Sequence, residues 1–427
     1  MTNELKDRIS KIRSGEVPEG YKKTVCGIIP DEWNICRFKQ KFTRLKSKNC
    51  ESNSNILTIS AQYGLINQEE FFKKEVASDD KSNYYLLNKG DFAYNKSYSN
   101  GYPYGAVKPL TRYEKGIVSP LYICFSPADD SFCADYYTHY FESGLLNKEI
   151  HAIAQEGARN HGLLNVSVDD FFNTNILCPP LPEQKKIAEI LSTQDKVIAL
   201  IQKQIEELKK LKKAYLQKMF PQKDSLYPEI RFKGFTDAWE QRELGTITSS
   251  YSGGTPTAGK SEYYGGDIPF IRSGEIDEEK TELFLSELGY NNSSAAMVEK
   301  GDILYALYGA TSGEVSISKL KGAINQAILA IKPNEGYDSE FMMQWLKNQK
   351  DNIISTYLQG GQGNLSGAIV KSLKVDITTY EEQQQIGTYF RSLDTLITLH
   401  QRKSEQEQQK EKALMQLLLT GIVRVKV

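Results

Sequence analysis

The chain carries an internal repeat, and this repeat restricts the possible folds more than any other feature of the sequence. Residues 165–220 align with residues 364–419 without a gap, at a constant shift of 199 positions. Pairs that coincide in this register are Glu183-Gln184 with Glu382-Gln383, Ile187 with Ile386, Asp195 with Asp394, Ile198 with Ile397, and Lys213-Ala214 with Lys412-Ala413. Because such a register marks a duplicated structural unit, we expect two related halves and a pseudo-twofold chain.

A long helix closes each half. In the first copy, spacings of four and three residues join Ile187, Leu191, Gln194, Ile198, Ile201, Ile205, Leu208, Lys212, Tyr215 and Met219. This is the seam of a coiled coil, and a helix from Glu183 to Met219 would be about 55 Å long. The second copy is apolar at Ile386, Phe390, Leu393 and Ile397 but polar at His400, Ser404, Glu407 and Glu411. We expect the two helices to pair as an antiparallel coiled-coil spacer; the alternative is two unrelated surface helices.

The bodies before the helices differ from each other. Looser matches link Asp31-Glu32-Trp33 with Asp237-Ala238-Trp239, and Lys89-Gly90-Asp91 with Lys300-Gly301-Asp302. Short apolar runs between turn residues predict α+β domains, with strands at 56–60, 83–87, 91–95 and 119–125 in the first body and at 267–271, 302–307 and 323–331 in the second.

Composition excludes several classes of protein. With 427 residues, 40% hydrophobic and 25% charged, the chain resembles a globular protein of two or three domains. Its first residues are charged and no apolar run reaches membrane-spanning length, which predicts a cytoplasmic protein. The six cysteines form no C-x-x-C pair and the four histidines have no metal-ligand spacing, so we expect no metal site. The net charge of −1 does not itself indicate a nucleic-acid partner.

One stretch matches a nucleotide-binding pattern. Gly254, Gly259, Lys260 and Ser261 fit the phosphate-loop spacing G-x-x-x-x-G-K-[ST]. That loop needs a buried strand before it and a helix after it. Here the preceding residues are half polar, and Gly265, Gly266 and Pro269 oppose a helix beyond it. We therefore interpret the match as a coincidence, with a stand-alone ATPase kept as an alternative.

Loops in both bodies are rich in Tyr, Asn, Ser, Gly and Lys, as in residues 95–105 and 305–313. Amide, hydroxyl and cationic groups suit base edges and phosphates, and glycines allow close approach of the backbone. Such loops also occur on protein-binding surfaces and in ordinary turns. Composition alone leaves these alternatives open.

Several motifs resemble one family. These are Pro179-Pro180-Leu181-Pro182-Glu183-Gln184, its counterpart Glu381-Glu382-Gln383, the closing Leu417-Leu418-Leu419-Thr420-Gly421 with Val423-Arg424-Val425, and the stretch SGGTPTAGKSEYYGGDIPFIRSGEI at 252–276. Across its whole length the chain is similar to the specificity subunit of Type I restriction–modification systems. The second copy departs from the first by having Thr378 and Thr379 in place of the two prolines.

The resemblance implies a domain plan and a set of partners. Residues 1–178 would form a first target-recognition domain with an N-terminal helical segment, 179–220 a central helix, 221–377 a second recognition domain, and 378–427 a C-terminal helix and tail. The subunit would be non-catalytic and bind double-stranded DNA, methyltransferase subunits (two copies) and motor–nuclease subunits, but no membrane. S-adenosylmethionine, ATP and magnesium would act in those partners, with no cofactor bound to this chain.

Candidate DNA-binding residues follow from the loops. They are Lys96, Tyr98, Tyr102, Lys108 and Arg112 in the first body, and Lys260, Arg272, Tyr305, Tyr308 and Gln326 in the second. The competing interpretation is that the tyrosines pack beneath their own loops. Two further alternatives to DNA recognition are a nuclease using Glu278-Glu279-Lys280, a charged run more typical of a solvated turn, and a protein-only scaffold.

Overall fold

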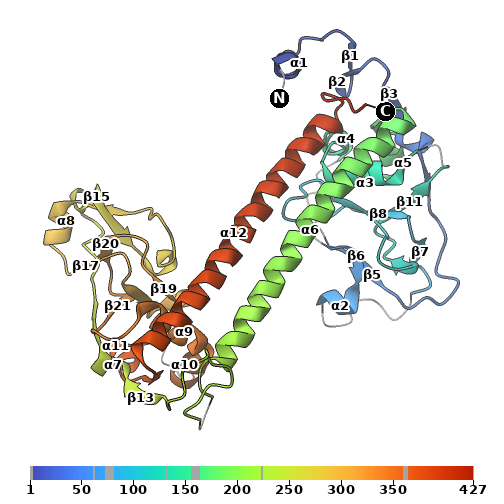
Figure 1. Cartoon of the computed structure of the whole chain (residues 1–427). Coiled ribbons are helices and arrows are strands. Elements are labelled where there is room, and N and C mark those ends of the chain that lie inside the picture. The colour runs from blue at the N-terminus through green and yellow to red at the C-terminus, as the bar shows by residue number, and fades with distance from the viewer. Residues whose placement is uncertain are drawn as a thin grey trace. The chain divides into compact units, whose positions relative to one another are not determined.

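The computed structural model describes residues 3–60, 63–72, 81–129, 132–154, 164–222, 225–358 and 364–426. These residues divide into two compact units, one comprising Met1–Leu200 with Lys403–Val427 and the other Ile201–Arg402. Each unit therefore combines one variable body with half of each long helix (Figure 1). Among the described residues, no helix is both long and apolar enough to cross a membrane.

The first unit is built around a four-stranded antiparallel sheet. Its order is β4 (Phe42–Arg44), β11 (Ile123–Pro127), β8 (Phe92–Asn95), β9 (Ala106–Pro109). Two-stranded pairs surround it: β1 (Tyr21–Thr24) with β2 (Gly27–Pro30), β3 (Asn34–Arg37) with β12 (Asn175–Cys178), β5 (Leu57–Ser60) with β6 (Gly64–Asn67), and β7 (Tyr85–Asn88) with β10 (Lys115–Val118). The helices are α1 (Asn3–Ser14), α2 (Gln68–Phe72), α3 (Ala134–Glu142), α4 (Asn147–Ile153) and α5 (Val168–Phe172).

The second unit contains a sheet of the same design. Its order is β14 (Thr248–Ser252), β21 (Ile328–Pro333), β18 (Ile303–Ala306), β19 (Val315–Ile317). A second sheet orders β16 (Phe284–Leu285), β15 (Tyr264–Ile271), β20 (Gly322–Ile324) and β17 (Ala296–Val298), and β13 (Glu240–Glu243) pairs with β22 (Lys374–Ile377). The helices are α7 (Leu244–Ile247), α8 (Glu287–Asn291), α9 (Ser339–Asn348), α10 (Lys350–Tyr357) and α11 (Gly367–Lys371).

The repeated motifs explain why the two halves share this design. In both Lys-Gly-Asp turns the glycine has a positive φ, 93° at Gly90 and 98° at Gly301, which L side chains rarely adopt. The aspartate then accepts a backbone N–H three residues earlier, at 2.6 Å for Asp91 and 2.8 Å for Asp302. Each turn delivers the chain into the equivalent strand, β8 or β18.

The long helices pair in both units, which confirms the predicted helix pair. They are α6 (Leu181–Lys218) and α12 (Tyr380–Leu418), which run side by side in opposite directions (Figure 1). Of the apolar seam residues predicted from the sequence, Leu208 and Tyr215 are partly exposed, and the others are buried: Ile187, Leu191, Ile198, Ile201, Ile205, Met219, Ile386, Phe390, Leu393 and Ile397. The α+β class with a long helix after each body is likewise confirmed.

One strand prediction is wrong. Residues 323–331 do not form a single strand, because the chain turns at 325–327 and the two parts enter different sheets as β20 and β21. Asn325 and Gln326 interrupt the apolar run at this turn, but the buried strands on either side are both apolar, so periodicity alone does not separate them. The run at 119–125 also forms a strand only from Ile123, since Ser119 and Pro120 belong to the preceding turn.

Candidate nucleic-acid interface and helix pair

The repeated glutamate at the start of each long helix is buried and bound by an arginine. Glu183 is 1% exposed and accepts hydrogen bonds from Trp33 Nε1 at 2.8 Å and from Arg424 Nε at 2.6 Å. Glu382 is 0% exposed and accepts from Arg231 Nε at 2.7 Å. A buried carboxylate without such a partner would be costly, so each glutamate fixes the segment that carries its arginine.

The neighbouring glutamine ties each recognition body to its helix. Gln184 Oε1 accepts the backbone N–H of Cys133 at 3.0 Å, and its Nε2 donates to the Pro179 carbonyl at 2.7 Å. Gln383 makes the same two contacts, with the N–H of Asp338 at 3.0 Å and the Thr378 carbonyl at 2.7 Å. The Glu-Gln motif therefore positions α3 or α9 against the first turn of the long helix.

Polar contacts complete the seam between the long helices. In the first unit, Gln194 Nε2 donates to a carboxylate oxygen of Glu407 at 2.6 Å. In the second unit, Lys212 Nζ lies 2.7 Å from both carboxylate oxygens of Asp394. Ser404 is buried, with 7% of its surface exposed. The polar middle of the second copy thus packs through hydrogen bonds and small side chains.

The candidates in the first body divide into a bound pair and three others. Lys108 Nζ lies 3.1 Å from Tyr102 Oη, and both groups bind the carboxylate of Glu142 at the end of α3. Tyr98 is 62% exposed and Arg112 is exposed, whereas Lys96 is half-buried just after β8. Because Glu142 already neutralises Lys108, the freer groups for a phosphate or a base are those of Tyr98 and Arg112.

The glycine-rich stretch of the second body packs against a candidate residue. Thr255 Oγ1 donates to Gln326 Oε1 at 2.8 Å. A Cβ at Gly253 would lie 1.8 Å from the Ile324 carbonyl oxygen, so this glycine allows the loop to reach β20. After Ser261 the chain forms only one 3-10 turn, Ser261–Tyr263, before strand β15. The helix that a phosphate loop requires is therefore replaced by a strand, and Lys260 Nζ contacts Tyr263 Oη at 3.0 Å.

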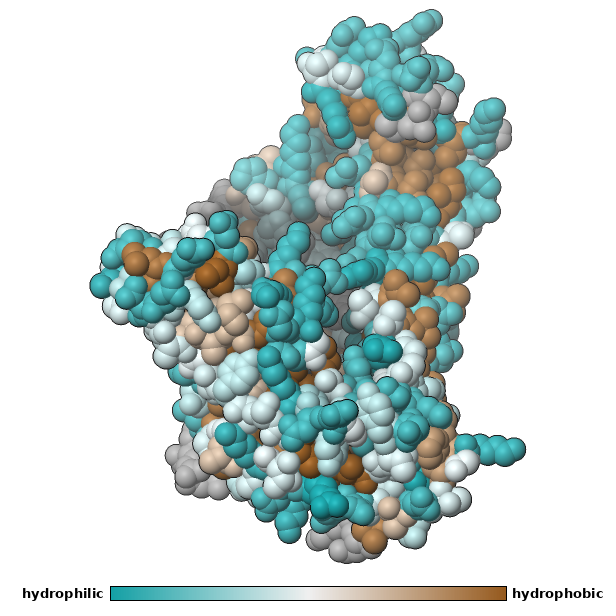
Figure 2. Space-filling view, turned by 60° about the vertical axis from the view of Figure 1, so that its left-hand side comes forward, coloured by the Kyte–Doolittle hydropathy of each residue, from teal (hydrophilic) through white to brown (hydrophobic). Residues whose placement is uncertain are grey.

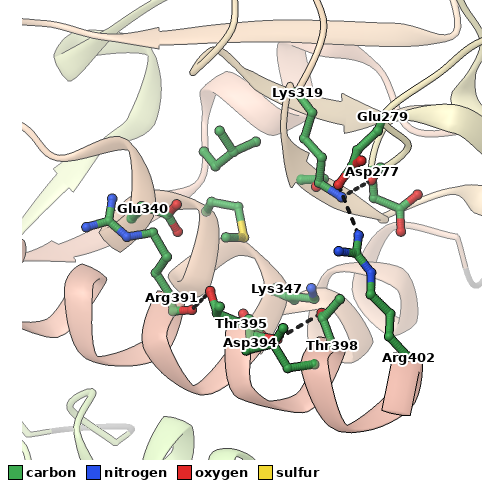
Figure 3. A pocket seen from close by; sticks show the side chains of 14 residues that line it. Asp277, Glu279, Lys319, Glu340, Lys347, Arg391, Asp394, Thr395, Thr398 and Arg402 are labelled. Carbon is green, nitrogen blue, oxygen red and sulfur yellow. Dashed lines mark hydrogen bonds and ion pairs between the residues drawn. The ribbon is translucent and has the colours of Figure 1, made fainter. Parts of the chain in front are cut away.

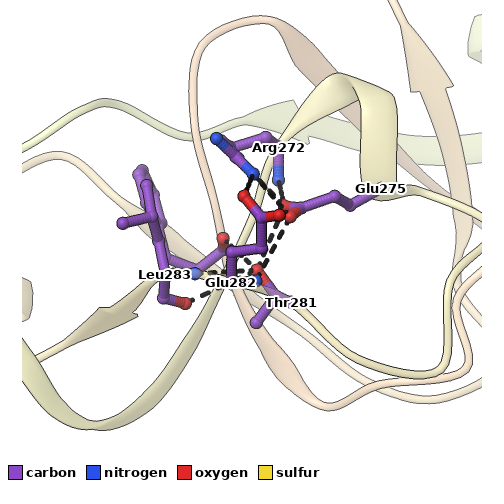
Figure 4. Close-up of polar contacts among 6 residues, drawn as sticks. Arg272, Glu275, Thr281, Glu282 and Leu283 are labelled. Atoms are coloured by element: carbon purple, nitrogen blue, oxygen red, sulfur yellow. Dashed lines mark hydrogen bonds and ion pairs between the residues drawn. The ribbon is translucent and has the colours of Figure 1, made fainter. Parts of the chain in front are cut away.

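Arg272 is held by two glutamates (Figure 4). Glu275 accepts from Nε at 3.1 Å and from Nη2 at 2.7 Å, and Glu282 accepts from Nη2 at 2.6 Å. Burial alone would raise the pKa of Glu275, but hydrogen bonds from Arg272, Glu282 and Thr281 lower it to about 2. The side chain of Glu275 is 12% exposed and that of Glu282 is 81% exposed, so the Glu275 carboxylate is largely buried and the Glu282 carboxylate lies in solvent.

The two remaining tyrosines differ in exposure. Tyr305 lies inside β18 and is 0% exposed, and burial raises its pKa to about 12. Its side chain therefore offers no surface to DNA, as the packing interpretation anticipated for tyrosines. Tyr308 is half-buried at the end of the same hairpin and precedes the 3-10 turn Gly309–Thr311.

A charged cavity lies between the second body and α12, within the second unit (Figure 3). Arg402 Nη2 donates a hydrogen bond to Glu279 Oε1 at 3.2 Å, and Lys319 Nζ donates one to the backbone carbonyl of Asp277. Its ionisable lining residues are Asp277, Glu279, Lys319, Glu340, Lys347, Arg391, Asp394 and Arg402. Because cations and carboxylates are equal in number, the cavity has no net preference for an anion. Glu279 also belongs to the run considered above for a nuclease, and here it forms a surface ion pair.

Sequence analysis did not assign roles to several residues that shape these sites. Thr255, Glu275 and Glu282 each bind a candidate DNA-contacting side chain. The Arg272–Glu275 spacing of three residues is a local signal that was available, whereas Thr255 and Gln326 are 71 positions apart. Among the described residues, no group of three or more His, Cys, Asp or Glu is arranged to hold a metal ion. His161 lies outside the described residues.

Comparison with known proteins identifies the class of the chain. The family model described as "Type I restriction modification DNA specificity domain" matches twice, at residues 33–210 and 236–408. The chain therefore belongs to the family of Type I restriction–modification specificity subunits, which are non-catalytic within their enzyme complex.

Individual relatives agree with this assignment. The putative type I restriction enzyme MjaX specificity subunit of Methanocaldococcus jannaschii is 27% identical, covering 96% of this chain and 97% of that protein. The MjaVIII specificity subunit of the same organism is 29% identical over 73% of this chain and 76% of its own length. The crystal structure of the S subunit from M. genitalium shares the fold, with a TM-score of 0.59 and 17% identity over 92% of this chain and 97% of that one.

Proposed function

We propose that each recognition body reads one half of a split DNA target, and that the paired helices set the distance between the half-sites. The observation that carries this proposal is the duplication: the two bodies share the sheet order and the Glu-Gln attachment to a long helix. Their loops differ, which fits two different half-sites. We expect the protein to act in the cytoplasm as part of a DNA-methylating and DNA-restricting complex.

Domain exchange tests the modular reading, and we further propose that the domain boundaries lie at 178, 220 and 377. We replace residues 22–160 with the body of a relative and map methylated sites across the genome of cells that carry the hybrid. One half of the target should change while the other stays the same. Simultaneous loss of both half-sites in a correctly assembled complex would contradict independent reading.

We further propose that the DNA contacts of the second body include Arg272, Lys260, Tyr308 and Gln326. Tyr305 is left out because it is buried. Arg272 follows β15; its side chain is 42% exposed, and its guanidinium is oriented by Glu275. Since Nε and Nη2 donate to Glu275 and Glu282, bidentate contact with a guanine edge would use Nη1 together with the Nη2 N–H that the exposed Glu282 releases, and such a contact gives about 1–3 kcal/mol of discrimination. In the first body we retain Lys96, Tyr98, Arg112 and the bound pair Tyr102–Lys108.

Arg272→Ala is the sharpest test of a base contact. We expect relaxed selectivity at one position of the second half-site, with the first half-site and assembly with the methyltransferase unchanged. Arg242→Ala is the matched control, because Arg242 lies in the same unit and makes an exposed ion pair with Glu240. Unchanged selectivity in the Arg272 variant would remove this residue from the interface.

The helix pair is also proposed to dock the methyltransferase and restriction subunits. In the second unit a hollow on the pair is lined by Leu208, Leu211 and Leu396 together with Gln204, Glu207 and His400. Leu396 also lines a neighbouring hollow with Leu399, which is 55% exposed. Hydrophilic residues predominate on the face shown in Figure 2, where apolar residues form separate patches. Exposed leucines that lie close together are typical of protein–protein contacts.

The expected partners are two methyltransferase subunits and motor–nuclease subunits, and these would carry S-adenosylmethionine, ATP and magnesium. Leu396→Glu with Leu399→Glu should abolish co-purification with the methyltransferase, while Leu288→Glu, which changes an equally exposed leucine on α8 of the same unit, should leave co-purification unchanged. Normal co-purification of the double variant would place the docking surface elsewhere.

A further inference from the structure

The two units differ in charge at one equivalent position of the helix pair. The gapless repeat relates Asp195 to Asp394, and Glu411 to Lys212. The Gln184 and Gln383 contacts relate Cys133 to Asp338, so that His139, six residues later, corresponds to Gln344. The same three places are thus filled by His139, Asp195 and Glu411 in the first unit and by Gln344, Asp394 and Lys212 in the second.

In the second unit the central aspartate is fully compensated. Lys212 Nζ contacts both oxygens of Asp394 at 2.7 Å, and the lysine side chain is only 10% exposed. Gln344 Nε2 donates to the same carboxylate at 3.0 Å. A lysine ammonium and an amide therefore neutralise and orient Asp394, where α6, α9 and α12 meet; burial lowers the pKa of Lys212, and the charge and hydrogen bonds of Asp394 oppose that shift.

In the first unit a carboxyl group occupies the place of that lysine. By the repeat, the half-buried Glu411 on α12 lies against Asp195 on α6 as Lys212 lies against Asp394, and the charge of Asp195 acts on Glu411. His139 Nδ1 lies 3.9 Å from Asp195, and His139 Nε2 lies 3.2 Å from Ser192 Oγ. Burial lowers the pKa of His139, although Asp195, Asp135 and Glu142 act in the opposite direction, so the imidazole is neutral at neutral pH.

The remaining charged neighbours do not replace the missing cation. Glu142 on α3 is bound to Lys108 and Tyr102, and its charge acts on Glu411 in the same direction as that of Asp195. Lys412, next to Glu411 on α12, acts in the opposite direction. Two carboxyl groups that lie against each other need one proton between them, because two adjacent negative charges repel.

We propose that Glu411 and Asp195 form a proton-operated latch, in which a proton on Glu411 fastens α12 to α6 in the first unit and its loss loosens that contact. The latch is specific to this unit, since at the equivalent place in the other unit Lys212 supplies a cation that pairs with Asp394. The inference rests on the helix pair and not on the proposed DNA contacts.

The direction of the pH dependence follows from the proton count. Burial, followed by the hydrogen bond and charge of Asp195, raises the pKa of Glu411 to about 8. An opened helix would release this proton near pH ~4.3. Between these values the closed state holds one more proton, so its stability is greatest at low pH and declines as pH rises towards about 8. The opening constant increases by at most about tenfold per pH unit.

Hydrogen exchange in the full-length chain tests the latch. We measure protection of the backbone amides in residues 403–418 from pH 6 to pH 9, corrected for the intrinsic exchange rate at each pH. The wild type should lose protection up to about pH 8, whereas the nearly isosteric Glu411→Gln should show a flat profile. Glu411→Lys should raise protection at pH 8 above both, because it rebuilds the Lys212–Asp394 arrangement.

A reciprocal variant in the other unit is the matched control. Lys212→Glu places two carboxyl groups together there and should transfer the pH dependence to residues 380–402. Equal pH profiles for the wild type and Glu411→Gln would overturn the proposal. So would a Glu411→Lys variant that is no better protected than the wild type at pH 8, because charge complementarity would then not be the missing element.

Discussion

The closing tail of the chain offers a quantitative test of what the repeated glutamate does. Arg424 donates to Glu183 from Nε at 2.6 Å and from Nη2 at 2.9 Å. Arg424→Met keeps most of the apolar stem and removes the guanidinium. Glu183, which is 1% exposed, would then retain Trp33 Nε1 as its hydrogen-bond donor among the described residues.

The expected loss in the free energy of unfolding can be worked out from the burial of the two side chains. Removing one partner of a fully buried ion pair costs about 3–5 kcal/mol. Because Arg424 is 32% exposed, water replaces part of the lost interaction, and we expect about 2–3 kcal/mol. For a unit of this size that corresponds to a fall in melting temperature of roughly 5–10 °C.

Scanning calorimetry of three variants provides the measurement. Arg231→Met should lower the melting temperature at least as much as Arg424→Met, because the Arg231 side chain is only 13% exposed and that of Glu382 is 0% exposed. Arg242→Met removes an exposed ion pair and should change the melting temperature by about 1 °C or less. A loss for Arg424→Met no larger than for Arg242→Met would refute the view that Glu183 depends on its arginine.

Four further predictions follow from the structure. Inserting four residues near Ile201, with four more at the facing level of α12, should lengthen the nonspecific spacer of the DNA target by about two base pairs, since each helical residue adds about 1.5 Å. The spacer length is measured by methylation mapping, and an unchanged spacer would contradict this role of the helices. Gly253→Ala should destabilise the second unit while Gly259→Ala, with nothing within 4 Å of its Cβ, should not, and equal melting temperatures would contradict the packing role. Lys212→Met should cost about 2–3 kcal/mol in chemical denaturation, because it leaves Asp394 with Gln344 alone. The contribution of the ionised Glu275 to the free energy of unfolding should persist above about pH 4 and disappear as pH falls towards about 2. The stability of the wild type should therefore fall with pH in that window, whereas that of Glu275→Gln should not.

Local pattern was sufficient to predict the duplicated plan and the helix pair. The heptad spacing depends on neighbours within one or two helical turns, and the gapless register appears when the chain is compared with itself at a shift of 199 residues, so both signals are present in the sequence itself. Ile187, Leu191 and Ile386 are accordingly buried as predicted. The same reasoning judged the phosphate-loop match correctly, because the residues that oppose a helix after Ser261 are also local.

Tertiary structure decided which polar residues are free to act. Tyr305 and Tyr308 belong to similar stretches of sequence, yet β18 buries the first completely and leaves the second half-exposed. Lys108 is neutralised by Glu142, which lies 34 positions away, and Arg272 is held partly by Glu282. Charge and exposure depend on contacts that are distant in sequence, so composition alone did not reveal them.

The repeat itself also conceals differences that only packing exposes. The sequence determines that Glu411 and Lys212 occupy equivalent positions, because the register is continuous through both. It does not determine that each lies against an aspartate of the facing helix, since that contact arises when α6 and α12 pair in an antiparallel direction. The energy of a charged group is set by the neighbours that replace its water, and those neighbours are brought there by the fold.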